Sequence, residues 1–234
     1  MDIQIIGNGD IRSNSFNTVF LINNILVGAP GGTLKMLKQK QINIDDISLI
    51  IITHLHGEEY FDLPQIIYHE YQRGRTKSLV IIGPANLKRQ VNKLLKMANY
   101  QINPSKQNFT LDFIAADTIQ NANLALDLYF SFINVRHANL KECYALIIKN
   151  QALALGYTGG ASLCPGLSYL LKEVKTCLIP LSNDELDLTL AEFTELASAY
   201  PITYLPLSYP AEIKDELKQI KNVKILEAGE QFFI

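Results

Sequence analysis

The stretch that most constrains the fold is residues 53–63, which directly follow an apolar run at residues 49–52. It reads Thr-His-Leu-His-Gly-Glu-Glu-Tyr-Phe-Asp-Leu. A short, apolar and β-branched run is typical of a strand covered on both faces, and here it ends in polar residues. His54 and His56 lie two positions apart, so in extended backbone both imidazoles point the same way. The pattern predicts a metal site at the end of a buried strand.

Composition indicates an ordinary globular protein. The chain has 234 residues, of which 48% are hydrophobic and 19% charged, enough for one large core. The net charge is −2, and no polybasic block is present, so composition predicts neither a nucleic-acid nor a membrane-surface partner. Because no repeat, low-complexity tract or composition break divides the chain, we expect one domain over residues 1–234.

The ends of the chain and its cysteines bear on the compartment. The N-terminus starts with an acid, unlike a secretory signal, and no apolar segment approaches the ~20 residues that span a bilayer. Cys143, Cys164 and Cys177 are odd in number and widely spaced, which favours free, buried thiols over a disulfide framework. We therefore expect a cytoplasmic protein with no membrane partner.

Apolar periodicity predicts interleaved strands and helices. The clearest helix starts at Pro84, since Leu87, Val91, Leu94 and Ala98 form one apolar face. Strands are expected at residues 19–27 with a turn at 23–24, and at 49–53, 79–82, 124–132, 144–148, 152–155, 176–179, 202–205 and 223–226. Further helices are expected at residues 33–40, 63–71, 165–174, 188–200 and 211–220. This order favours α/β layers with mixed sheets.

The chain resembles metallo-β-lactamase-fold hydrolases, in the branch similar to ribonuclease Z and its phosphodiesterase relatives. That family carries Thr-His-x-His-x-Asp-His followed by x-x-Gly-Leu, and residues 53–63 resemble this motif. Residues 27–33 resemble the strand and turn before the motif, and residues 82–84 resemble a later strand–turn–helix. His137 falls where the family places its next metal-binding histidine. The resemblance covers nearly the whole chain and implies a four-layer αββα sandwich with the site along one edge of the two sheets.

The chain departs from this family at four positions. Glu58 replaces the motif's Asp, and Glu59 replaces its second-metal His. Tyr157 stands at the metal-bridging Asp, and Pro206 at the final His. The resemblance, with these departures, implies that two-metal phosphodiesterase chemistry is lost.

Three histidines remain for at most one metal per chain, zinc or another divalent transition metal: His54, His56 and His137. Three imidazoles with an open fourth position can lower the pKa of a bound water to about 7. Glu58 is a candidate base or orienter of that water, and Tyr157 a candidate donor to an oxyanion or to substrate. The alternative is a relic pocket without metal. Glu59 either lies near a cation or faces solvent as an ordinary loop charge.

Two functions stay open on these grounds. The first is a mononuclear hydrolase acting on an unidentified small molecule or phosphoester-type ligand. The second is a catalytically inactive relative that binds a nucleotide, RNA or protein partner in the former cleft. A nucleic-acid partner and a homodimer are expectations of the resemblance alone. The basic turn at residues 73–77 either contacts phosphates or is a solvated loop.

Overall fold

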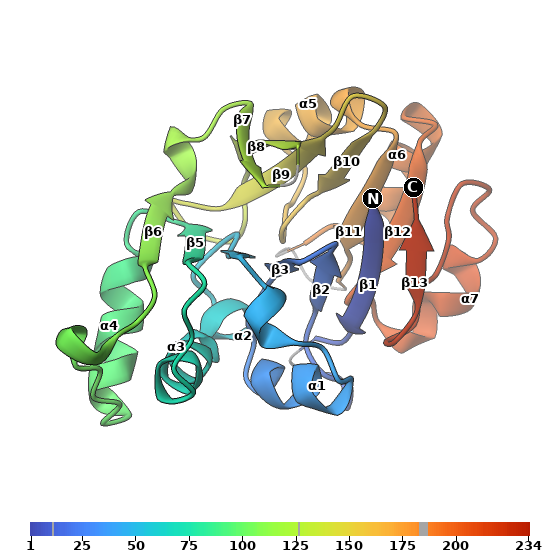
Figure 1. Cartoon of the computed structure of the whole chain (residues 1–234). Coiled ribbons are helices and arrows are strands. Elements are labelled where there is room, and N and C mark those ends of the chain that lie inside the picture. The colour runs from blue at the N-terminus through green and yellow to red at the C-terminus, as the bar shows by residue number, and fades with distance from the viewer. Residues whose placement is uncertain (11, 126, 183–186) are drawn as a thin grey trace.

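Two β-sheets form the framework of this computed structural model, which describes residues 1–10, 12–125, 127–182 and 187–234 (Figure 1). Among these residues, the first sheet has seven strands in the order β13-β1-β2-β3-β4-β5-β6. Its strands are β1 (Asp2–Gly7), β2 (Val19–Ile22), β3 (Ile25–Val27), β4 (Leu49–Ile51), β5 (Leu79–Gly83), β6 (Leu111–Ala115) and β13 (Gln231–Phe233). The second has six strands in the order β12-β11-β10-β9-β8-β7. These are β7 (Ala122–Ala125), β8 (Leu128–Asn134), β9 (Tyr144–Lys149), β10 (Ala154–Tyr157), β11 (Thr176–Pro180) and β12 (Thr203–Leu207).

Helices cover the outer face of each sheet. The first sheet is covered by α1 (Thr33–Gln39), α3 (Leu63–Gln72) and α4 (Leu87–Met97), whose apolar residues form one core cluster with the strands. The second sheet is covered by α5 (Pro165–Glu173), α6 (Leu190–Ala199) and the short α7 (Lys214–Leu217). A third cluster, with Phe20 and Phe130 at its centre, fills the space between the sheets. The expected αββα sandwich of two mixed sheets is confirmed.

The two sheets meet at the end of β4. The backbone of His54 forms an isolated antiparallel bridge with Cys143, and the amide of Tyr144 donates to the carbonyl oxygen of Thr53 at 3.1 Å. This contact joins the first sheet to the start of β9 in the second. The polar segment after β4 is thereby held at the edge where the sheets converge.

Several elements differ from the sequence expectation. Residues 124–132 were expected as one strand but form the β7–β8 hairpin, because Asp127 adopts a left-handed φ of 57° that Asp tolerates in turns. Residues 223–226 form no strand, and Val223 makes only an isolated bridge to Tyr204. The two edge strands, β6 and β13, are not predicted, because no residue of either is fully buried and neither shows a clear apolar face in the sequence.

The helix expected at residues 211–220 is a 3-10 turn at Ala211–Ile213 followed by the four-residue α7, and most of the other expectations agree. The turn at residues 23–24 joins β2 to β3, and α4 begins three residues after Pro84. The three cysteines are free, with Cys143 and Cys177 buried and Cys164 half-buried. No helix in the described part of the chain is both long enough and apolar enough to cross a membrane.

Candidate metal centre

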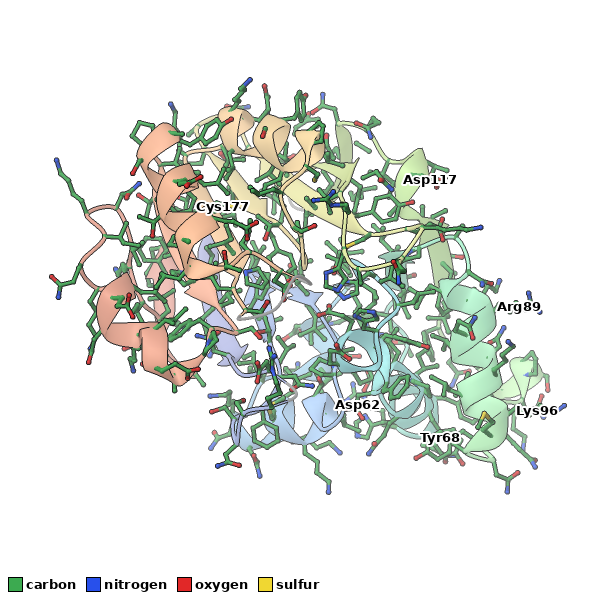
Figure 2. The ribbon with its side chains drawn as sticks, turned by 180° about the vertical axis from the view of Figure 1, so that it is seen from behind. Asp62, Tyr68, Arg89, Lys96, Asp117 and Cys177 are labelled. Carbon is green, nitrogen blue, oxygen red and sulfur yellow. The ribbon has the colours of Figure 1, made fainter. Side chains whose placement is uncertain are left out.

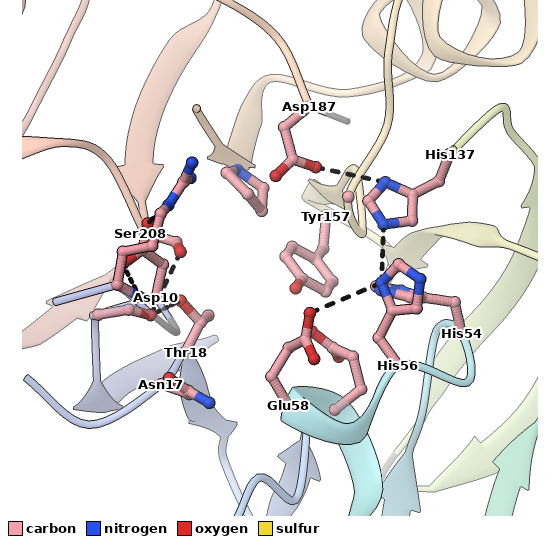
Figure 3. Close-up of a pocket in the computed structure, with 15 residues that line it drawn as sticks. Asp10, Asn17, Thr18, His54, His56, Glu58, His137, Tyr157, Asp187 and Ser208 are labelled. Atoms are coloured by element: carbon pink, nitrogen blue, oxygen red, sulfur yellow. Dashed lines mark hydrogen bonds and ion pairs between the residues drawn. The ribbon is translucent and has the colours of Figure 1, made fainter. Parts of the chain in front are cut away.

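Three histidine side chains converge at the junction of the two sheets (Figure 3). His54 and His56 follow β4, and His137 follows β8. One ligand atom from each lies within 4.8 Å of the other two. Nδ1 of His56 is 3.2 Å from Nε2 of His137. The structure thus brings together the three histidines that the sequence singled out.

Two neighbouring side chains set the orientation of the rings. The Thr53 hydroxyl lies 3.0 Å from Nδ1 of His54, and a carboxylate oxygen of Asp187 lies 3.5 Å from Nδ1 of His137. The opposite nitrogen, Nε2, of each ring is then the one available for ligation. The Thr53 contact is a hydrogen bond, which is the usual means of fixing the tautomer of a metal-binding histidine, whereas Asp187 approaches His137 at ion-pair distance.

Burial and neighbouring charges keep two of these imidazoles, His54 and His56, neutral near pH 7. Burial lowers the pKa of His54 well below 6.5, and the nearby His137 and His56 lower it further. Burial also lowers the pKa of His56, an effect that Glu58 and Asp187 partly oppose. Neutral imidazole is the form that binds metal, so these two residues are ready for ligation near neutral pH.

His56 and His137 have the spacing of two ligands of one small divalent ion, and His54, whose ligand atom lies within 4.8 Å of theirs, would complete the set by a small side-chain movement. Two nitrogens bound at about 2.1 Å in tetrahedral geometry are about 3.4 Å apart. The 3.2 Å between His56 and His137 is close to that separation. The histidines line a cavity of about 180 Å³, which leaves room for a further ligand on the open side.

Glu58 stands beside the cluster. It lies in α2 (Gly57–Tyr60), the short turn that begins directly after His56. Its carboxylate Oε1 is 3.6 Å from Nδ1 of His56, and its side chain is about one-third exposed, at 35%. A carboxylate in this place can accept a proton from a water in the cavity.

Glu59 is buried, which overturns its solvent-facing alternative. Burial raises the pKa of its carboxyl to about 8, and the charges of Glu58 and Asp187 add to this rise. A bond from the Thr53 hydroxyl, at 3.5 Å, opposes it only in part. Glu59 is therefore mostly protonated at pH 7, at the place where the resembling family has a histidine.

Tyr157 fills the wall of the same cavity. It lies at the end of β10, and its ring packs edge-on against Phe20 with centroids 5.0 Å apart. Burial, followed by the charges of Glu59 and Asp187, raises the pKa of its phenol well above 10. The phenol is therefore neutral, and its hydroxyl can donate a hydrogen bond as well as accept one.

Six polar residues that the structure describes in the cavity are not among the predicted site residues: Asp10, Arg12, Asn17, Thr18, Asp187 and Ser208. Asp187 comes from the segment after β11 and carries no family motif, so only the structure reveals its position beside His137. Ser208 lines the cavity, whereas the alignment had pointed to Pro206, two residues earlier on β12. The fourth histidine, His69, lies on α3 and contacts Glu70 at 2.9 Å.

The basic turn at residues 73–77 does not offer Arg75 to phosphates, so the predicted phosphate contact is wrong for this residue. Only 2% of Arg75 is exposed. Its guanidinium pairs with Glu70 at 3.0 Å and donates to the carbonyl oxygens of Ile44, Ile47, Lys77 and Ser78. Arg75 therefore ties the end of α3 to the loop before β4.

Comparison with known families decides the affiliation. The family described as "Anti-Pycsar protein Apyc1" matches residues 1–230. The chain belongs to the Apyc1 family. This Apyc1-family chain is also 30% identical over 163 residues to ribonuclease Z of Clostridium beijerinckii, and 30% identical over 140 residues to that of Clostridioides difficile. These matches cover 64% and 54% of this chain, and 50% and 46% of the relatives. The chain thus spans about half the length of the curated relatives that it matches.

Solved structures show the same fold. The short form of human tRNase Z superposes with a TM-score of 0.78 at 14% identity, over 100% of this chain and 99% of that one. YhfI of Bacillus subtilis, a metallo-β-lactamase-fold protein, superposes with a TM-score of 0.75 at 16% identity, over 99% and 98%. Zinc-bound PqqB of Methylobacterium extorquens gives 0.72 at 9% identity, over the whole of both chains. The suspected metallo-β-lactamase, ribonuclease Z-like affiliation is confirmed.

Proposed function

We propose that this protein is a hydrolase that uses a single divalent metal, zinc or a similar transition metal, held by His54, His56 and His137. The observation that carries the proposal is the convergence of three imidazoles with ligand atoms within 4.8 Å of one another. Two of them also have an orienting partner on the far ring nitrogen. Such donors suit zinc and other transition metals better than magnesium or calcium.

Each residue of the site has its own role in the proposed reaction. A zinc-type ion, when bound, supplies Lewis-acid polarisation and lowers the pKa of a water at the open position to about 7. Glu58, partly exposed beside His56, orients that water and takes its proton. Tyr157, a neutral phenol in the cavity wall, donates a hydrogen bond to the oxygen on which negative charge develops.

We further propose that the place of a second metal is taken by neutral groups. Glu59, protonated because it is buried, and Tyr157 stand where the resembling family has a histidine and a bridging aspartate. Neither offers a charged ligand near neutral pH. A two-metal clamp on both the attacking and leaving oxygens is therefore not available to this chain.

The relatives support a phosphodiester as the substrate class. Ribonuclease Z is named for action on RNA, and the Apyc1 family for action against Pycsar. We infer that this chain acts on a phosphoester-type ligand in the cytoplasm, and the resemblance supports a homodimer. The cavity of about 180 Å³ limits what enters fully to a small molecule or to one end of a longer chain.

A second candidate function is ligand binding without turnover. The observation in its favour is the buried Tyr157, which packs on Phe20 and occupies space beside the histidines. In this alternative the former cleft holds a nucleotide, an RNA segment or a protein partner.

Metal content tests the proposal. Protein purified without chelator and dialysed against limiting zinc is expected to hold about one zinc per chain by elemental analysis. The double variant His56→Ala/His137→Ala should lose it, and His69→Gln, which changes the histidine outside the site, should keep it. The parent protein should also hydrolyse bis(p-nitrophenyl) phosphate. Absence of zinc from the parent would refute the hydrolase, and zinc without turnover would favour the binding alternative.

A further inference from the structure

Charge is strongly segregated along this chain. Residues 71–111 contain no Asp or Glu and hold eight of the 21 Lys and Arg residues, whereas the rest of the chain holds all 23 acidic residues. Three of the eight are paired to acids from outside this stretch: Arg73 to Asp45, Arg75 to Glu70, and Lys77 to Asp46. The other five lie on α4 and in the loop that follows it. A near-neutral net charge thus conceals a basic surface.

The outer face of α4 carries four of these cations. Lys88, Arg89, Lys93 and Lys96 are all exposed. Steps of four residues align Lys88 with Lys96, and Arg89 with Lys93, in two adjacent rows. Among the described residues, no carboxylate lies within ion-pair distance of any of the four. They border a shallow, widely open groove of about 530 Å³ whose described lining residues all come from α4 and Ala85 just before it, and Figure 2 shows Arg89 and Lys96 on the outward side of the helix.

A second groove continues from the first and adds an aromatic ring. It has a volume of about 690 Å³ and shares Asn92 and Lys96 with the first groove. Its walls include Tyr100 and the side-chain amides of Asn99, Gln101 and Gln107. The Tyr100 ring stacks flat on Tyr68, with centroids 4.4 Å apart and planes 3° from parallel. The stack holds Tyr100 in a fixed orientation at the end of the row of cations.

We propose that these two grooves form a docking surface for single-stranded nucleic acid, with RNA as its partner. Rows of unpaired cations beside an aromatic ring and amide groups are the features that such strands require. The cations neutralise phosphates, the ring stacks on a base, and the amides hydrogen-bond to base edges. An anionic membrane fits less well, because a membrane-surface helix also needs large apolar side chains beside its cations. On α4 the large exposed hydrophobic is Met97 alone.

The docking surface adjoins the metal centre. At the start of α4, the amide of Ala85, which lines the first groove, donates to Glu142 at 3.4 Å. The next residue, Cys143, is the one whose backbone bridges His54. The start of α4 is thereby tied to the loop that bridges His54, although the first groove and the metal cavity have no lining residue in common among those that the structure describes. Binding at the surface does not depend on turnover, so it extends beyond the proposed hydrolase function.

Fluorescence anisotropy with a labelled oligouridylate of about 16 nucleotides tests the proposal, in EDTA so that no metal-dependent turnover occurs. Four phosphate contacts predict that log K falls with log salt at a slope of about −2.8 between about 50 and 200 mM salt. The variant Lys88→Gln/Lys93→Gln/Lys96→Gln should weaken binding about 100-fold near 0.1 M salt. The matched control Lys172→Gln/Lys175→Gln/Lys221→Gln removes the same charge from exposed positions elsewhere, and should bind as the parent does.

Variants of Tyr100 distinguish the contribution of base stacking from that of charge. Tyr100→Ala should weaken binding roughly 5- to 100-fold with the salt slope unchanged, and Tyr100→Phe should restore it. Thermal melts of each variant identify any loss of folding. The proposal is overturned if the parent does not bind at low salt, or if the control variant loses as much affinity as the α4 variant. It is likewise overturned if the α4 lysines are needed for binding to phosphatidylserine vesicles but not to the oligonucleotide.

Discussion

Replacing Glu59 by Gln should change how the stability of the metal-free protein depends on pH. In the folded chain, burial raises the pKa of Glu59 from 4.5 to about 8. The folded state therefore keeps a proton that the unfolded state loses between these two values. Since the folded state binds more protons, the free energy of unfolding falls as pH rises through this window. Gln cannot ionise, so Glu59→Gln removes this loss while keeping the size of the side chain.

The magnitude follows from the two pKa values. At about 1.36 kcal/mol per pKa unit, the full shift corresponds to a loss of about 5 kcal/mol by pH 8. Roughly half of it, about 2.3 kcal/mol, falls between pH 6 and pH 8. The lowered pKa values of His54 and His56 act in the opposite direction, because a folded state that releases protons gains stability as pH rises. These histidines are present in both proteins, so the difference between parent and variant isolates Glu59.

Urea unfolding in EDTA at pH 6, 7 and 8 measures this difference. Relative to the parent, the variant should already be more stable by about 2 kcal/mol at pH 6, where the unfolded state has lost the proton of Glu59, and by about 4 kcal/mol at pH 8, so the difference should widen by about 2 kcal/mol over this range. If the two free energies of unfolding change in parallel over this range, Glu59 is already ionised in the folded protein. The reasoning that places a neutral acid beside the histidines would then be refuted.

Three further changes have predictable results. Glu70→Ala leaves the buried Arg75 guanidinium without its carboxylate, so it should lower the free energy of unfolding by about 3–5 kcal/mol. Urea titrations measure this loss, and a value below about 1 kcal/mol would contradict the prediction. Asp187→Asn weakens the partner of Nδ1 of His137 and should reduce zinc affinity about 10- to 100-fold. Competition with a chromogenic chelator measures this affinity, and an affinity equal to that of the parent would show that Asp187 plays no part in the site. Gly160→Ala introduces a Cβ 2.8 Å from Asp187 Oδ1 and His137 Cε1, so it should displace the imidazole of His137. Elemental analysis should then find a lower zinc occupancy, whereas full occupancy would show that the ring has room to move.

The main features of the fold could be predicted because they depend on local pattern. The β-branched run before His54 identifies β4, and the two-residue spacing of His54 and His56 places both rings on one side of the extended chain. His137 was found only through the family resemblance, since 81 residues separate it from His56. The turn inside residues 124–132 is not predicted because Asp127 stands at a polar position of an unbroken alternation, so the pattern does not show where the chain turns.

The chemistry around the histidines depends on contacts that sequence spacing does not record. Glu59 is buried because α2 turns it inward, whereas Glu58, one residue earlier, reaches the cavity edge. Asp187 arrives from the second sheet's side of the site, without a motif to mark it. Arg75 is read in the sequence as part of a basic turn, yet four backbone carbonyl oxygens and one carboxylate surround it. Burial and partners of this kind come from tertiary packing alone.

The central claim, one metal bound by three histidines, is tested most directly by anomalous X-ray scattering at the zinc edge from crystals grown with excess zinc. The account predicts a single anomalous peak in the cavity, about 2.1 Å from Nε2 of His54, Nδ1 of His56 and Nε2 of His137. A cavity without a peak would contradict it, and so would a second peak between Glu59 and Tyr157.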